Sequence, residues 1–236
     1  MKTVQDNRER KERDTILEKR LPLLRKIYDT CVSAYPINSI IPSSCDVFSD
    51  PFVEDLITGP PFSATFTEQD LVTVETTFFD IVSRWRKKVE EKLLDMISQA
   101  CGTQNISESV FKLATTIFTC KYCHDDPLTY PRVLVHRCTR RYCYRNNDPA
   151  LRILGCSSWI SSECITFEAQ KLGVLTEAIK LCGLDPQSAT GEDIDKQKPI
   201  FECLACNNAR KGRCTLSLPG LVWFFFMMIR NFVANL

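Results

Sequence analysis

The stretch over residues 67–100, TEQDLVTVETTFFDIVSRWRKKVEEKLLDMISQA, decides the fold class of this chain. Its apolar residues recur at steps of three and four: Leu71, Val74, Phe78, Ile81, Trp85, Val89, Leu93, Met96 and Ala100. Charged residues fill most of the other positions, which is the pattern of an amphipathic helix packed on a core. Thr67 is a suitable N-cap, and Gly102 lies where helices often end. We therefore predict one long helix here.

Helical patterns also dominate the rest of the N-terminal half. Residues 1–35 form a charged helical arm, in which acidic and basic side chains alternate over 4–20 and which Pro22 is expected to bend or split. A Pro- and Ser-rich connector follows at 36–66, with one short helix that Asp50 can cap. A second short helix, over 107–117, completes a helical region that spans 67–117.

The C-terminal half is rich in cysteine and mixed in its pattern. Residues 118–214 form this Cys-rich region, in which 132–136 has the composition of a strand and 166–182 that of a helix ending at Gly183. A short helix is expected to start near Thr190. We therefore predict a mainly α fold with a small β and zinc-knuckle element.

The composition is that of an ordinary globular protein. The chain has 236 residues, with 30 Lys and Arg against 29 Asp and Glu, and this balance argues against a dedicated nucleic-acid-binding protein. Thirteen cysteines, an odd number, do not suggest a disulfide framework. The first twenty residues are charged and contain no apolar segment typical of a secretory signal. We therefore expect reduced thiols and a cytoplasmic or nuclear location.

Two CxxC pairs, Cys120/Cys123 and Cys203/Cys206, carry the strongest chemical signal. A CxxC turn can present two thiolates to one tetrahedral zinc ion, and two such turns complete a closed, structural site. The gap from residue 124 to 202 is far longer than the roughly 15–20 residues usual between paired knuckles. Such an insertion is still possible, because the entropy of loop closure grows only logarithmically with length.

A second ligand set is available near the first pair. His136 and Cys138 could complete a compact site of three thiolates and one imidazole with Cys120 and Cys123. In the alternative interpretation, His136 only ends a strand and bonds a backbone carbonyl. Both ligand sets predict Zn2+ as a structural cofactor.

Other chemistries have weaker support in the sequence. Thioredoxin-like catalysis needs a CxxC at the start of a helix, whereas Cys120 follows a predicted helix and acidic Asp125 and Asp126 come after it. No phosphate loop, nucleophile elbow or zinc-protease motif is present, so we predict no catalytic residue and no enzyme. Basic residues at 84–88 and 137–145 could contact nucleic acid, but a solvated helix face and a polar loop explain them better, because the net charge is balanced.

The C-terminal tail, residues 215–236, stands apart. Leu218 to Ile229 contains no charge, but these residues are too few to cross a bilayer, which needs about 20. The tail could be a core helix or strand, a membrane anchor, or the product of a wrongly assigned gene end. We expect no membrane partner unless it is a real anchor.

Five motifs can be compared with known families: Asp50-Pro-Phe-Val-Glu-Asp-Leu-Ile57, Cys120-x-x-Cys123, Tyr130-Pro-Arg-Val-Leu-Val-His136, Cys182-Gly-Leu-Asp-Pro186 and Cys203-x-x-Cys206. Together they resemble the region downstream of the F-box in basidiomycete (mushroom-type) F-box proteins, over about residues 20–214. This resemblance implies a protein-interaction module, as in the target-binding part of a ubiquitin-ligase adaptor. It also implies that both CxxC pairs are metal ligands.

The chain departs from that family in two respects. No F-box is recognisable around Arg20-Leu-Pro-Leu23, and the apolar tail replaces the histidines that relatives carry after the second CxxC. Our prediction is therefore a zinc-stabilised module that binds a protein partner. The alternatives are a zinc-containing nucleic-acid-binding protein and, third, a thiol-dependent redox enzyme.

Overall fold

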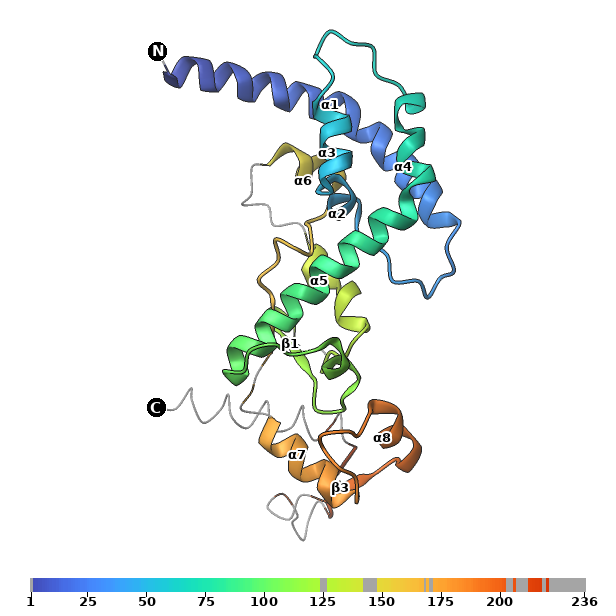
Figure 1. The fold of residues 1–236 in the computed structure, drawn as a ribbon, viewed down its shortest axis with the longest axis vertical. Coiled ribbons are helices and arrows are strands. Elements are labelled where there is room, and N and C mark those ends of the chain that lie inside the picture. Colours follow the sequence, from blue (N-terminus) through green and yellow to red (C-terminus); the bar gives the residue numbers. More distant parts are fainter. Residues whose placement is uncertain are drawn as a thin grey trace. The chain divides into compact units, whose positions relative to one another are not determined.

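The structure is a computed structural model that describes residues 2–123, 127–141, 148–167, 169, 172–202, 206, 212–217 and 220. These residues form two compact units (Figure 1). Unit 1 comprises Met1–Lys92 and Leu134–Glu163, and unit 2 comprises Leu93–Val133 and Cys164–Leu236. The described part is mainly α, with two small antiparallel sheets of two strands each, as the sequence predicts.

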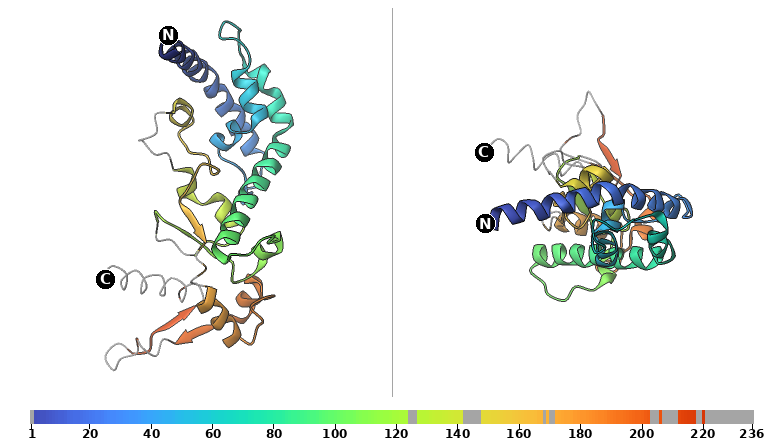
Figure 2. Two further views of the ribbon diagram at one scale, coloured as in Figure 1. Left: turned by 60° about the vertical axis from the view of Figure 1, so that its left-hand side comes forward. Right: turned by 90° about the horizontal axis from the view of Figure 1, so that it is seen from above.

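Unit 1 is built around helix α1 (Lys2–Ser33), which contacts α2 (Ser44–Phe48), α3 (Pro51–Thr58) and α6 (Pro149–Leu154). The views in Figures 1 and 2 show α1 running beside these short helices. Leu17, Leu21 and Leu24 of α1 are fully buried in the core that they share. Because these leucines recur at helical spacing, they lie on one face of α1 and pack it against the rest of the unit.

Pro22 does not split α1, since the helix continues to Ser33, whereas the bend that we named as the other outcome stays a prediction. The proline lacks one backbone N–H, so one intrahelical hydrogen bond is missing. Leu21 and Leu24 flank Pro22 and are buried in the same core, so packing on both sides of the proline holds the helix together.

Arg20 adds a polar anchor to this apolar face. Its guanidinium is buried and donates hydrogen bonds to the carbonyl oxygens of Ile57 (2.6 Å), Pro60 (2.9 Å) and Pro61 (2.9 Å). The Ile57 carbonyl belongs to the last turn of α3 and the other two follow the helix, where carbonyls have no intrahelical partners. Arg20 thus holds the connector against α1.

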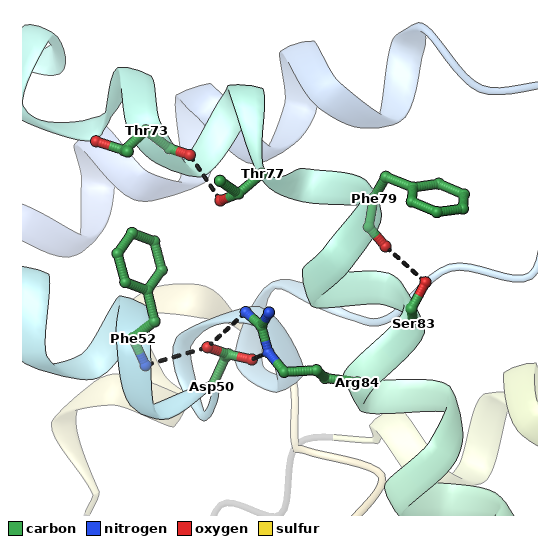
Figure 3. Close-up of polar contacts among 7 residues, drawn as sticks. All are labelled: Asp50, Phe52, Thr73, Thr77, Phe79, Ser83 and Arg84. Carbon is green, nitrogen blue, oxygen red and sulfur yellow. Dashed lines mark hydrogen bonds and ion pairs between the residues drawn. The ribbon is translucent and has the colours of Figure 1, made fainter.

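Helix α3 confirms the predicted short helix and its cap. The side chain of Asp50 accepts a hydrogen bond from the backbone N–H of Phe52 (3.1 Å), and Pro51 occupies the first helical position. Arg84 of α5 (Phe78–Cys101) adds two hydrogen bonds to the same carboxylate (Figure 3). The cap therefore also ties α3 to α5.

The long helix predicted over 67–100 is interrupted. Its residues form the 3-10 turn η1 (Glu68–Leu71), α4 (Val72–Thr76) and α5. Thr67 acts as the predicted cap, since its N–H and hydroxyl both donate to Asp70. The break falls at Thr77, whose hydroxyl bonds to the carbonyl of Thr73 (2.7 Å, Figure 3). Such side-chain bonds compete with the helical backbone.

Unit 2 contains both sheets. Strand β1 (Phe118–Cys120) pairs with β2 (Ile165–Phe167), and β3 (Ile200–Glu202) pairs with β4 (Thr215–Ser217). Figure 2 shows the β3–β4 pair beside α7 (Leu172–Leu181), and Phe201 packs on the core formed by α7 and α8 (Gly191–Gln197). Thr190 caps α8 as predicted, through a capping box with Asp193.

Three local predictions beyond residue 100 are wrong. Residues 132–136 are not a strand, because Arg132–Val135 forms the 3-10 turn η3, in which adjacent Val133 and Leu134 are both fully buried. A strand would place neighbouring side chains on opposite faces. The helix predicted over 107–117 is only the 3-10 turn η2 (Glu108–Lys112), since Ala114 instead donates to the carbonyl of Ala189.

The third correction concerns residues 166–182. Their first residues belong to strand β2, because they pair with β1, and the helix begins only at Leu172. Gly183 follows the helix with a φ of +74°, as a C-terminal stop should. No helix within the described residues is both long and apolar enough to cross a bilayer, and residues 221–236 of the tail lie outside them.

Candidate metal centre

The first two candidate ligands lie at the end of strand β1. Cys120 is its last residue and Cys123 follows after a bend. The backbone N–H of Tyr122 donates to the sulfur of Cys120 (3.4 Å). A sulfur that receives a backbone N–H is stabilised as a thiolate, which is the form that binds metal.

Hydrogen bonds in unit 2 hold this turn in place. Phe118 and Leu128 exchange two backbone hydrogen bonds (2.8 and 2.9 Å), and Lys121 donates to the carbonyl of Cys164 (2.8 Å). Phe111 and Tyr130 also stack, with ring centroids 4.9 Å apart. The segment around Leu128 therefore runs alongside β1.

The other two candidate ligands flank the start of the 3-10 turn η4 (Arg137–Arg140). His136 is the N-cap residue of η4, and Cys138 is the second residue of this turn. The carbonyl oxygen of His136 accepts hydrogen bonds from the backbone N–H (3.1 Å) and the hydroxyl (2.6 Å) of Thr139. These two hydrogen bonds fix the turn that carries both ligand side chains.

These four residues lie close together. One ligand atom from each of Cys120, Cys123, His136 and Cys138 lies within 4.8 Å of all the others. Cys120, His136 and Cys138 are only 6%, 7% and 8% exposed, and Cys123 is half-buried. The cluster therefore contains three sulfurs and one imidazole nitrogen, largely removed from solvent.

This donor set fits one chemistry in particular. Tetrahedral zinc with Zn–S bonds near 2.3 Å places pairs of sulfurs about 3.8 Å apart, so the observed upper limit of 4.8 Å requires only a small contraction. Three thiolates and one imidazole fill all four positions. A filled site leaves no place for water or substrate, which is the mark of a structural centre.

The sequence predicted both ligand sets, and the structure brings one of them together. His136 and Cys138, the alternative ligands, join Cys120 and Cys123. Cys203 lies outside the described residues, and Cys206 is described but is not part of this cluster. A zinc site shared by the two CxxC pairs therefore stays a prediction. His124 also lies outside the described residues.

The contacts that hold β1 and the Cys120–Cys123 turn in place could not be predicted from the sequence as the ligands could. Leu128 and Cys164 position β1 through backbone atoms alone, so their side chains carry no signature of that role. The sequence contains no pattern that predicts the stacking of Phe111 on Tyr130, because the two residues are far apart in the chain. No protein-family model, curated protein or solved structure matches the chain.

Proposed function

We propose that Cys120, Cys123, His136 and Cys138 bind one structural zinc ion, and that the chain is a protein-interaction module stabilised by it. The closed cluster of four ligand atoms within 4.8 Å carries this proposal. The filled donor set supports a structural role, because catalytic zinc needs an open position.

Three arginines of the two basic stretches are held in ways that favour a protein partner over nucleic acid. Arg84 is held by Asp50, and Arg86 donates to the carbonyl of Ile40 (3.3 Å). Arg140 donates to the carbonyl of Ile41. Guanidinium groups committed to internal hydrogen bonds are poorly placed to neutralise phosphates, which is the main source of nucleic-acid affinity.

Exposed apolar side chains in unit 1 are consistent with protein binding. Phe79 on α5 is 70% exposed, and Phe52 and Phe62 are also exposed. Aromatic residues are enriched in protein interfaces. The resemblance to the region downstream of the F-box supports a more specific role, as the target-binding part of a ubiquitin-ligase adaptor.

Metal analysis of the purified full chain tests the zinc centre. We expect His136→Ala and Cys138→Ser to lose one equivalent of zinc, whereas Cys203→Ser and the exposed control Cys101→Ser keep it. Zinc-edge X-ray absorption of the unmodified chain should count three sulfurs and one nitrogen. Four sulfurs, or zinc loss only in Cys203→Ser, would overturn our ligand set in favour of the shared CxxC site.

The ligase role needs its own experiment. The zinc-loaded chain is mixed with the purified subunit that links F-box proteins to a cullin, and complex formation is followed by gel filtration. A stable complex supports the adaptor role. Its absence removes direct docking of this chain to the ligase and leaves the zinc centre untouched, since the two measurements are independent.

A further inference from the structure

A second group of reactive side chains lies in unit 1, apart from the zinc ligands. Cys45 belongs to α2, and Cys156 follows α6 directly after Gly155. The Cys45 thiol donates a hydrogen bond to the backbone carbonyl oxygen of Cys156 (2.7 Å), which brings the two cysteines next to each other. The hydroxyl of Ser44 lies 3.3 Å from the sulfur of Cys156.

Buried hydrogen bonds hold the two segments together next to these sulfurs. One carboxylate oxygen of Asp46 accepts from the N–H (3.1 Å) and hydroxyl (2.6 Å) of Ser43. The other accepts from the hydroxyl of Ser158 (2.7 Å) and the N–H of Trp159 (2.7 Å). Asp46 adjoins Cys45, and Ser158 follows Cys156 by two residues. The pair of cysteines is therefore prearranged by the fold.

The two thiols have opposite character. The neighbouring Cys45 thiol and the Ser44 hydroxyl lower the pKa of Cys156 to about 6, against the opposing effect of burial. The hydrogen bond with Cys156 and burial raise the pKa of Cys45. Near neutral pH the pair therefore holds one thiolate and one protonated thiol.

The two thiols also differ in their access to solvent. Cys156, the thiolate, is only partly buried, whereas Cys45 is 2% exposed. A small electrophile therefore reaches Cys156 first. Thiolate character combined with access is what makes a cysteine susceptible to oxidation.

We propose that Cys156 is a site of oxidation by hydroperoxides and that Cys45 resolves the product into an intramolecular disulfide. In the first step the Cys156 thiolate attacks the distal peroxide oxygen and the O–O bond breaks, which gives a sulfenic acid and, after protonation, an alcohol or water. In the second step the Cys45 sulfur attacks the sulfenic sulfur, the S–O bond breaks and water leaves. The peroxide gains two electrons and the two thiols lose them.

Peptide mapping of the unmodified, zinc-loaded full chain is the primary test. The protein is treated with equimolar hydrogen peroxide, quenched with acid, alkylated and digested without reductant. We expect a Cys45–Cys156 cross-linked peptide to form before oxidation at exposed Cys101. Oxidation that reaches Cys101 first, with no cross-link, would overturn the proposal without requiring any variant to fold.

Three variants then separate the two roles. In Cys45→Ser, the sulfenic acid at Cys156 should persist and react with dimedone, since its resolving thiol is absent. In Cys156→Ser, Cys45 should stay unlabelled, and Cys101→Ser should cross-link as the unmodified chain does. Dimedone labelling of Cys45 in Cys156→Ser, or none of Cys156 in Cys45→Ser, would contradict the assignment of attacking and resolving thiols.

Discussion

Arg84 of α5 holds both carboxylate oxygens of Asp50, the N-cap of α3, at 2.8 Å (Nε–Oδ2) and 3.1 Å (Nη2–Oδ1) (Figure 3). The Asp50 side chain is 6% exposed and that of Arg84 is 45% exposed. The same carboxylate caps α3 through the N–H of Phe52. One buried carboxylate thus fixes the start of one helix and its attachment to another.

Loss of this guanidinium should destabilise unit 1. Arg84→Ala leaves the buried carboxylate of Asp50 without its charged partner, which we expect to cost about 1–3 kcal/mol of unfolding free energy. Chemical denaturation followed by circular dichroism measures the change. Arg13→Ala is the matched control, because its partner Glu54 is exposed and such surface pairs contribute about 0–1 kcal/mol. Equal effects of the two variants would contradict this assignment.

The buried carboxylate of Asp46 should matter more than any surface cap. Asp46→Ala removes the acceptor of four hydrogen bonds and leaves buried donors unpaired, so we expect a loss of about 3–5 kcal/mol. Denaturant titration checks the value. Asp70 makes a similar capping box with Thr67 at an exposed position, so Asp70→Ala should cause a distinctly smaller loss. A larger loss in Asp70→Ala would show that burial is not the deciding factor.

Zinc removal should lower thermal stability. Treatment with a strong chelator, or the substitution His136→Ala, should reduce the melting temperature of the chain, because the binding free energy of a structural metal contributes directly to folding. Differential scanning fluorimetry with and without added zinc provides the measurement. His136→Cys should retain zinc, since a fourth thiolate also completes a tetrahedral site. An unchanged melting temperature after complete zinc removal would be incompatible with a structural metal.

The thiol pair predicts a pH dependence of stability. The pKa of Cys156 is lowered from 9.0 to about 6 in the folded state, so between these values the unfolded chain binds more protons at this residue. The contribution of Cys156 is fully present above pH 9 and is lost as the pH falls through about 6. Cys45 and Tyr28 interact electrostatically with this thiol, and Asp46 and Arg140 interact in turn with these two groups.

Comparison of two chains isolates that contribution. Unfolding free energy measured from pH 6 to 8.5 should rise more steeply in the unmodified chain than in Cys156→Ser. Alkylation of Cys156 by iodoacetamide should reach half of its maximal rate near pH 6, as a thiolate with this pKa requires. Half-maximal alkylation at pH 8.5 or above would show that Cys156 is an ordinary thiol.

Pro22 offers a route to a more stable chain. It occupies an exposed position inside α1, where proline removes a helical hydrogen bond and crowds the preceding turn. Pro22→Ala should stabilise the protein by about 1–3 kcal/mol, with part of the gain offset by the greater freedom of the unfolded chain. Thermal denaturation tests this. A destabilised Pro22→Ala would mean that the proline shapes α1 in a way that its core requires.

Local patterns predicted local structure well. The caps at Asp50, Thr67 and Thr190 all lie where the sequence places them, because a capping side chain and its N–H partner are within three residues of each other. The mainly α class followed from periodicity in the same way. The errors at Thr77 and at 132–136 have a different origin. A hydroxyl competing for a helical carbonyl, or a strand without a pairing partner, depends on which neighbour is available.

Sequence patterns alone indicate a mainly helical chain and offer Cys120, Cys123, His136 and Cys138 as one of two sets of metal ligands, because helical periodicity and ligand spacing are short-range properties. Only the tertiary structure decided that these four ligand atoms converge within 4.8 Å. It alone also paired Cys45 with Cys156 and Asp50 with Arg84. Contacts between residues far apart in the chain depend on how whole helices pack, and that packing leaves no local pattern.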